Sequence, residues 1–392
     1  MDRIRGFVLT VFIAAVILVS AVGAQEEQWL NYRSAREGAE MPGDVRLVEV
    51  ALSEEAPKGI ELPRFENEGP LFGAWATPMV ENGRLWIAVD RTHKGGLCDR
   101  LLIDSNGDGR LADETALQAY KQDQHRTYFG PVKVIFQVED GPVVYHLNFQ
   151  FYRSGSIKRL YACSGGWYEG EITVGETKKQ CVLIDHNVNG AFNDKSIGPG
   201  DCDRLLVGGN APQDLRFVGR FVEIDGVLYR QRIAKDGACL TLTRAEDVKF
   251  GRVRAPGGIT QFSAGGENGS FLRVPEDGIA SLPVGLYCVN HWDIERRDGQ
   301  GLVWRMNGSF SARGTMFDVR EGAESELAIG EPIVATLNAS GDKGQYSFRQ
   351  GLKGNYGETI ALTRNGSRPP PPKLRIRNKD GTYDQTRSFE YG

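Results

Sequence analysis

The chain lacks the short motifs that identify the most common catalytic sites. No Gly-x-Ser-x-Gly, Gly-x-x-x-x-Gly-Lys-Ser/Thr or His-Glu-x-x-His segment occurs in its 392 residues. These motifs would indicate a serine hydrolase, a nucleotide-phosphate site and a zinc protease, respectively. No Cys-x-x-Cys pair occurs either, which argues against a zinc site or a dithiol redox site.

A large excess of charge of one sign is also absent. Lys and Arg number 47, Asp and Glu number 51, and the formal net charge is −4. Binding to nucleic acid needs a basic surface that this balance does not supply, so we expect no nucleic-acid partner. Basic residues do gather between Arg364 and Arg377, and we interpret that segment as a solvated strand edge rather than a polyanion site.

Cysteine is sparse, with six residues in the whole chain. A fold that depended on disulfides would be smaller and richer in cysteine. Two of the cysteines lie inside apolar runs, Cys181–Ile184 and Leu286–Val289. This placement favours buried cysteines that pack as small apolar side chains.

Long apolar runs are absent except at the start of the chain. Arg3 and Arg5 precede an apolar stretch from Phe7 to Val19, and the small residues Val22-Gly23-Ala24 follow it. This order is typical of an export signal, so we predict a signal peptide at residues 1–24 that is cleaved after Ala24. The alternative is a segment retained as a membrane anchor. We therefore expect a periplasmic or extracellular protein that has no membrane contact after cleavage.

Helical periodicity is scarce, and the best candidate for a helix is Glu114–Tyr120. Short runs of strand character recur instead, such as Arg84–Asp90. The runs Val132–Val138 and Val143–Tyr152 flank Glu139-Asp140-Gly141, and an Asp-Gly pair between two such runs predicts a β-hairpin. Asp225-Gly226 predicts another. With 49 glycines to form tight turns, the chain is predicted to be mainly β.

We predict a domain boundary near Arg254-Ala255-Pro256-Gly257-Gly258, where turn residues follow a charged stretch. We predict a β-rich region at 25–253 and a separate β-sandwich domain at 254–392, because turns separate short strands there at the spacing of a sandwich. Lys379-Asp380-Gly381-Thr382 predicts the last hairpin. The expected strands of this domain are Ser270–Val274, Gly285–Ile294, Met316–Arg320, Pro332–Asn338, Tyr346–Leu352, Thr359–Thr363, Leu374–Arg377 and Ser388–Tyr391.

The most specific feature present is an acidic loop that occurs twice. Both copies read apolar-Ile-Asp-x-Asn-x-[Asp/Asn]-Gly-x-apolar-x-Asp. The first begins at Asp104 and the second at Asp185. Oxygen-bearing side chains at alternate positions, followed by a glycine, allow a chain to wrap a hard cation such as Ca²⁺.

The two loops resemble the DxDxDG calcium loops of EF-hand and dockerin-like proteins over about thirteen residues each. The resemblance implies side-chain ligands at loop positions 1, 3 and 5, a carbonyl ligand at position 7, and here an Asp at position 10. An apolar residue at position 8, Leu111 or Phe192, would pin each loop to the core. The implied ligands are Asp104, Asn106, Asp108, Arg110 and Asp113 in the first loop, and Asp185, Asn187, Asn189, Ala191 and Asp194 in the second.

The loops also depart from the EF-hand pattern. Position 12, normally a bidentate Glu, is Thr115 in the first loop and Ser196 in the second. Both loops follow strand-like runs, so a helix-loop-helix pair is not expected. Glu114 is a further candidate ligand for an ion bound at the first loop. The first loop carries more carboxylates than the second. The alternative is that Asp and Asn only form Asx-turns, in which glycine adopts positive φ.

The segment Ile279–Val289 contains Leu-Pro-Val-Gly-Leu-Tyr-Cys-Val. It resembles the LPxGxYxV stretch of prealbumin-like, carboxypeptidase-regulatory-type sandwich domains. The resemblance covers one short strand and turn, and it implies a non-catalytic accessory module with an immunoglobulin-like or prealbumin-like sandwich.

These patterns together predict an exported calcium-binding structural or binding protein without catalytic activity. Its expected partners are Ca²⁺ and an extracellular or cell-surface protein or glycan. The alternative is a secreted hydrolase, or a carbohydrate-active or carbohydrate-binding protein, whose site gathers scattered acidic and aromatic residues. Trp292 and Trp304 are candidates for a sugar-stacking platform in that case, although buried sandwich tryptophans are more common.

Overall fold

The computed structural model describes residues 27–35, 42, 45–65, 69–93, 95–139, 141–209, 214–310, 314–342 and 345–390. These residues form mostly antiparallel sheets, and no α-helix occurs among them. The prediction of a mainly β chain is therefore confirmed. The predicted signal peptide at 1–24 lies outside the described residues. No described helix is long and apolar enough to cross a membrane.

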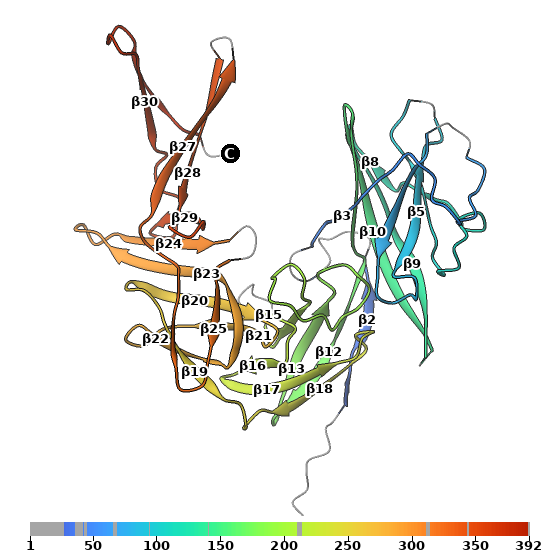
Figure 1. Ribbon diagram of the computed structural model, residues 1–392, viewed down its shortest axis with the longest axis horizontal. Coiled ribbons are helices and arrows are strands. Elements are labelled where there is room, and N and C mark those ends of the chain that lie inside the picture. The colour runs from blue at the N-terminus through green and yellow to red at the C-terminus, as the bar shows by residue number, and fades with distance from the viewer. Residues whose placement is uncertain are drawn as a thin grey trace, which may run out of the picture.

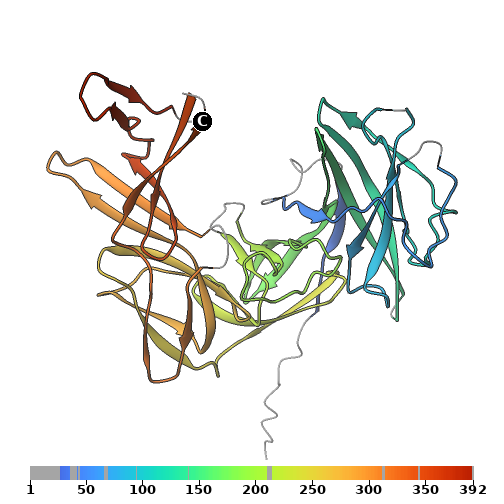
Figure 2. The ribbon, with the colours of Figure 1, turned by 45° about the horizontal axis from the view of Figure 1, so that its top comes forward.

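Figure 1 shows two lobes joined by a central group of sheets, and Figure 2 shows that the whole arrangement is bent. The first lobe contains two sheets. One has the order β4–β5–β6–β7, formed by Leu71–Ala76, Arg84–Asp90, Arg100–Ile103 and Leu117–Gln118. The other has the order β3–β11–β10–β9–β8, formed by Val48–Val50, Ile157–Ser164, Gly141–Ser154, Arg126–Val138 and Lys121–Gln122.

An aromatic cluster joins these two sheets. Trp75 of β4 is 2% exposed and stacks on Tyr145 of β10, with ring centroids 5.7 Å apart and an interplanar angle of 10°. Phe136 of β9 stacks on the other side of the cluster, 6.2 Å from Trp75. Burying such large rings removes much apolar surface from water, so the cluster is a main source of stability for this lobe.

The hairpin predicted around Glu139-Asp140-Gly141 is confirmed, because Val138 of β9 pairs with Gly141 of β10. The helix predicted at Glu114–Tyr120 is wrong. Leu117 pairs with Leu101 of β6 in the short strand β7. A helix of two turns is marginal by itself in water, whereas pairing to an existing sheet satisfies the backbone groups.

Two sheets form the centre of the molecule. One has the order β15–β14–β13–β12–β2, formed by Leu215–Phe217, Arg204–Val207, Thr177–Ile184, Gly166–Val174 and Asn31–Ser34. The other has the order β1–β18–β17–β16, formed by Glu27–Trp29, Cys239–Arg244, Val227–Ile233 and Phe221–Ile224. Ile224 pairs with Val227 across the turn at Asp225-Gly226, which confirms that predicted hairpin. One continuous core runs through these sheets and the first lobe.

The second lobe has its own core around Trp292 and Leu282, both fully buried. Its large sheet has the order β21–β20–β23–β24–β29–β28–β27, formed by Gly269–Arg273, Ile259–Gly266, Gly285–Arg297, Val303–Ser309, Thr359–Arg364, Gln345–Lys353 and Val334–Asp342. Strand β25 (Met316–Val319) also pairs with β23. The smaller sheet has the order β22–β19–β26, formed by Ile279–Pro283, Phe250–Arg254 and Glu324–Glu326. Strand β19, which begins at Phe250, before the boundary predicted between 253 and 254, therefore packs in the core of the second lobe.

Two hairpins project from the end of the second lobe (Figures 1 and 2). One is β27–β28, and the other consists of β30 (Lys373–Arg377) and β31 (Asp384–Ser388). The turn predicted at Lys379–Thr382 is confirmed, but the strand after it lies earlier than the predicted Ser388–Tyr391. All six cysteines are free, and Cys181 and Cys288 are fully buried, as predicted.

Candidate functional site

The first acidic loop follows β6 and is anchored on both sides by backbone hydrogen bonds. The amide of Asp104 donates to the Trp86 carbonyl (2.9 Å), and the Ser105 carbonyl accepts from the Ile135 amide (3.0 Å). The amide of Leu111 donates to the Glu61 carbonyl (2.8 Å). Leu111 is fully buried, so the prediction that this apolar residue pins the loop to the core is confirmed.

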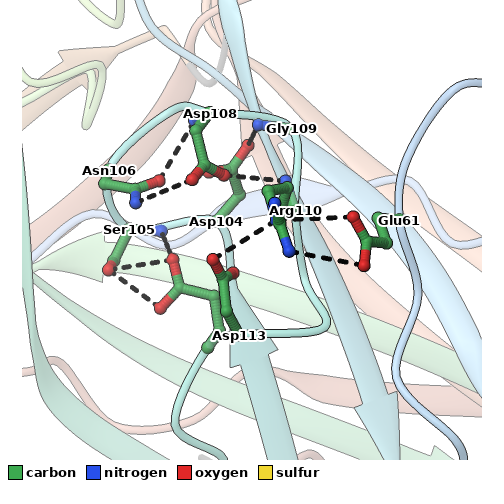
Figure 3. Close-up of polar contacts among 9 residues, drawn as sticks. Glu61, Asp104, Ser105, Asn106, Asp108, Gly109, Arg110 and Asp113 are labelled. Atoms are coloured by element: carbon green, nitrogen blue, oxygen red, sulfur yellow. Dashed lines mark hydrogen bonds and ion pairs between the residues drawn. The ribbon is translucent and has the colours of Figure 1, made fainter.

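Asp104 is buried at the base of the loop, with 2% exposure. Its Oδ2 accepts from the Gly109 amide at 3.0 Å (Figure 3). Its Oδ1 is buried and accepts no hydrogen bond from the described residues. Burial raises the pKa of Asp104, the amides of Gly109 and Gly107 partly offset that rise, and the negative charge of Asp108 adds to it. A buried carboxylate oxygen without a donor is costly unless another group, such as a cation, interacts with it.

Asn106 and Asp108 lie at the exposed tip of the same loop. The Asn106 Oδ1 accepts from the Asp108 amide (3.1 Å), and the Asp108 Oδ1 accepts from the Arg110 amide (2.9 Å). Gly107 and Gly109 have φ of 75° and 80°. These are the bonds and dihedrals of Asx-turns. The Asn106 Nδ2 also donates to Asp108 Oδ2 at 3.1 Å (Figure 3).

The other acidic residues of the first loop bind protein groups. Asp113 Oδ2 lies 3.4 Å from Arg110 Nε, and Arg110 also pairs with Glu61. The Glu114 carboxylate accepts from the Ser105 amide at 2.6 Å. No group of three or more His, Cys, Asp or Glu side chains in the described part of the chain is arranged to hold a metal ion. Of the remaining predicted ligands, Asn106 and Asp108 bind each other, and the charge of Asp108 acts on Asp104.

The second loop follows β13, and its first residue, Asp185, accepts more hydrogen bonds than Asp104 does in the first loop. Asp185 is 1% exposed. Its Oδ1 accepts from the amides of Val188 (2.6 Å) and Asn189 (3.3 Å). Its Oδ2 accepts from the Gly190 amide (2.7 Å) and the Tyr145 hydroxyl (2.8 Å). Both carboxylate oxygens of Asp185 are therefore satisfied by the protein itself.

The remaining predicted ligands of the second loop bind one another. Asp194 Oδ2 accepts from Asn187 Nδ2 (3.1 Å) and Asn189 Nδ2 (2.8 Å). Asn189 Oδ1 accepts from the Ala191 amide (2.8 Å). Ala191 and Phe192 are each 1% exposed, so Phe192 pins this loop as predicted. Asn187 Oδ1 is buried without a partner among the described residues.

Sequence reasoning missed Asp203, a fully buried residue at the second loop. Its carboxylate accepts from the amides of His186 (3.1 Å) and Asp194 (2.8 Å), so it holds both ends of the loop. Burial raises the pKa of Asp203 well above its usual value, and the nearby Asp185 raises it further. A faint signal exists, because Cys202-Asp203-Arg204-Leu205-Leu206 repeats the Cys-Asp-Arg-Leu-Leu sequence at 98–102.

The second loop is also bound to the first lobe. The indole Nε1 of Trp75 donates to the Val188 carbonyl at 2.7 Å. Val188 has φ of 58°, an uncommon value for a β-branched residue. A Cβ atom added at Gly190, where φ is 90°, would lie 3.0 Å from the Phe136 ring. The second loop is therefore a buried junction between the central sheet and the first lobe.

We expect Trp75→Phe to destabilise the protein by about 1–3 kcal/mol, because the buried Val188 carbonyl loses its donor. Urea unfolding measures this loss. Trp86→Phe is the matched control, since the half-buried Trp86 indole makes no comparable buried hydrogen bond in the described structure, and its effect should be smaller. Equal losses in the two variants would contradict the role given to Trp75.

We expect Asp185→Asn to change how stability depends on pH. Burial raises the pKa of Asp185 from 3.8 to about 7. The folded chain therefore keeps this proton where the unfolded chain has lost it, and the contribution of Asp185 to stability falls as pH rises from about 4 to about 7. An Asn cannot ionise, so the variant should lose less stability than the parent across this range.

Urea unfolding with a metal chelator present, repeated at several pH values across that range, tests the change. The difference between the two profiles reports Asp185 together with the buried Asp203, whose pKa its charge raises. Parallel profiles would show that the folded state does not hold this proton.

Comparison of the chain with protein-family models, with curated proteins and with solved structures finds no match. The function of the protein is therefore inferred from its own residues and their geometry.

Proposed function

We propose that this protein is an exported, calcium-binding structural or binding protein without catalytic activity, and that the ion binds at the first acidic loop. The observation that carries the proposal is the Oδ1 atom of Asp104, which is buried and accepts no hydrogen bond from the residues that the structure describes. A cation at this position would offset the cost of burying that oxygen.

The chemistry of the loop favours Ca²⁺ among common cations. Ca²⁺ takes six to eight oxygen ligands from carboxylates, amide and backbone carbonyls and water in flexible geometry. Asp104, Asn106 and Asp108 offer such oxygens from one turn of chain, and the backbone carbonyl of Arg110 is the fourth ligand implied by the loop pattern. Water would complete the shell. No Cys or His belongs to this group, which makes a softer metal a poorer fit.

The small number of carboxylates implies weak binding. Ligand charge tunes the affinity of such loops, and extracellular modules work at about 10⁻⁴–10⁻³ M. A site of this strength would be filled outside the cell, where the proposed export places the protein. Because the ion binds only the folded loop, it stabilises the fold by RT ln(1 + [L]/Kd). The ion would therefore hold the first loop in its folded conformation at the edge of the first lobe.

The proposal places the ion at the first loop rather than the second because the two loops differ in their free oxygens. Both carboxylate oxygens of Asp185 already accept hydrogen bonds. Asn187 and Asn189 turn their amide nitrogens toward Asp194. In the first loop Asn106 likewise donates to Asp108. The loops differ in which buried oxygen lacks a partner among the described residues: a carboxylate oxygen of Asp104 in the first loop, and only the neutral amide oxygen of Asn187 in the second.

Calcium should raise the melting temperature of the purified protein. At an ion concentration about ten times Kd the gain is roughly 1.4 kcal/mol, which corresponds to a shift of a few degrees. Asp104→Asn should abolish the difference between melts in calcium and in chelator. Glu54→Gln makes the same charge change at an exposed ion pair of the same lobe and should leave the difference intact. An identical melt with and without calcium would refute the site.

Glycan binding is a second candidate, and one observation favours it. Trp304 lines an open cavity of about 620 Å³ together with Gln350 and Arg368, an aromatic surface with polar groups nearby. Trp292 is fully buried and cannot share in the platform. If a soluble oligosaccharide binds there, titration should change the tryptophan fluorescence of the parent but not that of Trp304→Phe. No change for the parent across a panel of oligosaccharides would remove this candidate.

A further inference from the structure

Strand β27 (Val334–Asp342) is the edge of the large sheet in the second lobe and pairs with β28 alone. Its nine residues make it the longest edge strand in the part of the chain that the structure describes. In an antiparallel pair every second residue of an edge strand turns its amide and carbonyl away from its neighbour. Such a row of backbone groups is a template for another strand.

Except for the charge of Asp342 at its end, β27 lacks the usual protections of an edge. Natural proteins shorten edge strands, place charged residues or proline in them, or interrupt them with bulges. The segment Val334–Gly341 contains no charged residue and no proline. Its pairing with β28 runs without a break in register from Val334 to Asp342. Val334 and Leu337 are each 52% exposed.

The β27–β28 hairpin also has one apolar face. Leu337 is opposite Gln350, Ala339 is opposite Phe348, and Gly341 is opposite Tyr346. Because alternate residues share a face, the exposed Leu337 lies on the same side as the exposed Tyr346. An unprotected edge beside an apolar face is typical of a surface that becomes paired in the functional state.

We propose that two copies of this protein associate by antiparallel pairing of β27 with β27, which joins their large sheets into one. The uncharged segment Val334–Gly341 is complementary to itself, as a two-fold interface requires. With Asn338 opposite its own symmetry mate, Leu337 of one copy faces Ala339 of the other, and Thr336 faces Ser340. In this register no two residues of like charge face each other anywhere from Ala335 to Gly341.

The basic residues of the neighbouring strand do not prevent this pairing. Arg349 of β28 is opposite Asn338. In the joined sheet, three strand spacings, about 14 Å in total, would separate the two β28 strands. That distance exceeds the screening length of about 8 Å at physiological salt. Repulsion between the two Arg349 side chains is therefore small.

The test uses sedimentation equilibrium of the full protein after signal removal, over a range of concentrations, in calcium and in chelator. We expect a reversible dimer in both buffers, because the first loop is not part of this interface. Leu337→Lys and Leu337→Glu, studied separately, should each weaken dimerisation by at least tenfold, because they set like charges close together across the pair. A mixture of the two variants should recover the dimer by charge complementarity.

Val274→Lys is the matched control, because it also adds a charge at an exposed apolar residue (67% exposed) but lies outside β27. It should dimerise like the parent. A parent protein that stays monomeric up to its solubility limit would overturn the proposal. So would an association that Leu337→Lys leaves unchanged. Neither outcome bears on calcium binding, which the melting experiment tests independently.

Discussion

The set of hydrogen bonds that closes on the carboxylate of Asp185 is the constraint on which the architecture depends. Three backbone amides of its own loop and the Tyr145 hydroxyl satisfy both oxygens in a fully buried position. A buried carboxylate is tolerable only when it is satisfied or protonated, so the loop has one shape. That shape presents the Val188 carbonyl to Trp75 and leaves room for the Phe136 ring beside Gly190. The central sheet and the first lobe are joined through this loop.

The same sequence pattern is used in two physical ways. In the second loop the acidic side chain is buried. Backbone amides and the Tyr145 hydroxyl bind Asp185, and a second acid, Asp203, accepts from amides at both ends of the loop. In the first loop the pattern lies at the edge of the lobe, and one buried oxygen of Asp104 has no donor in the described part of the chain. A difference in burial of the tip therefore separates a junction from a candidate cation site. One copy of the motif thus stabilises the fold, and the other is the proposed cation site.

The elements that could be predicted from sequence are those set by local chemistry. The hairpins at Val138/Gly141 and Ile224/Val227 follow from turn residues that favour positive φ, and the structure has them where expected. The anchoring of Leu111 and Phe192 follows from apolar residues at fixed loop positions. Contacts between distant segments leave no such pattern. Asp203 joins the second loop, and Leu117 pairs with Leu101, because of tertiary placement that local propensity does not encode.

Isothermal titration of the metal-free protein with Ca²⁺, at a protein concentration comparable with the expected Kd so that the sites can be counted, tests the central claim most directly. The account predicts one ion per chain, absent from Asp104→Asn and retained by Asp185→Asn. Two ions per chain would contradict the assignment of the second loop as a closed junction. No detectable binding would contradict the first loop as a cation site.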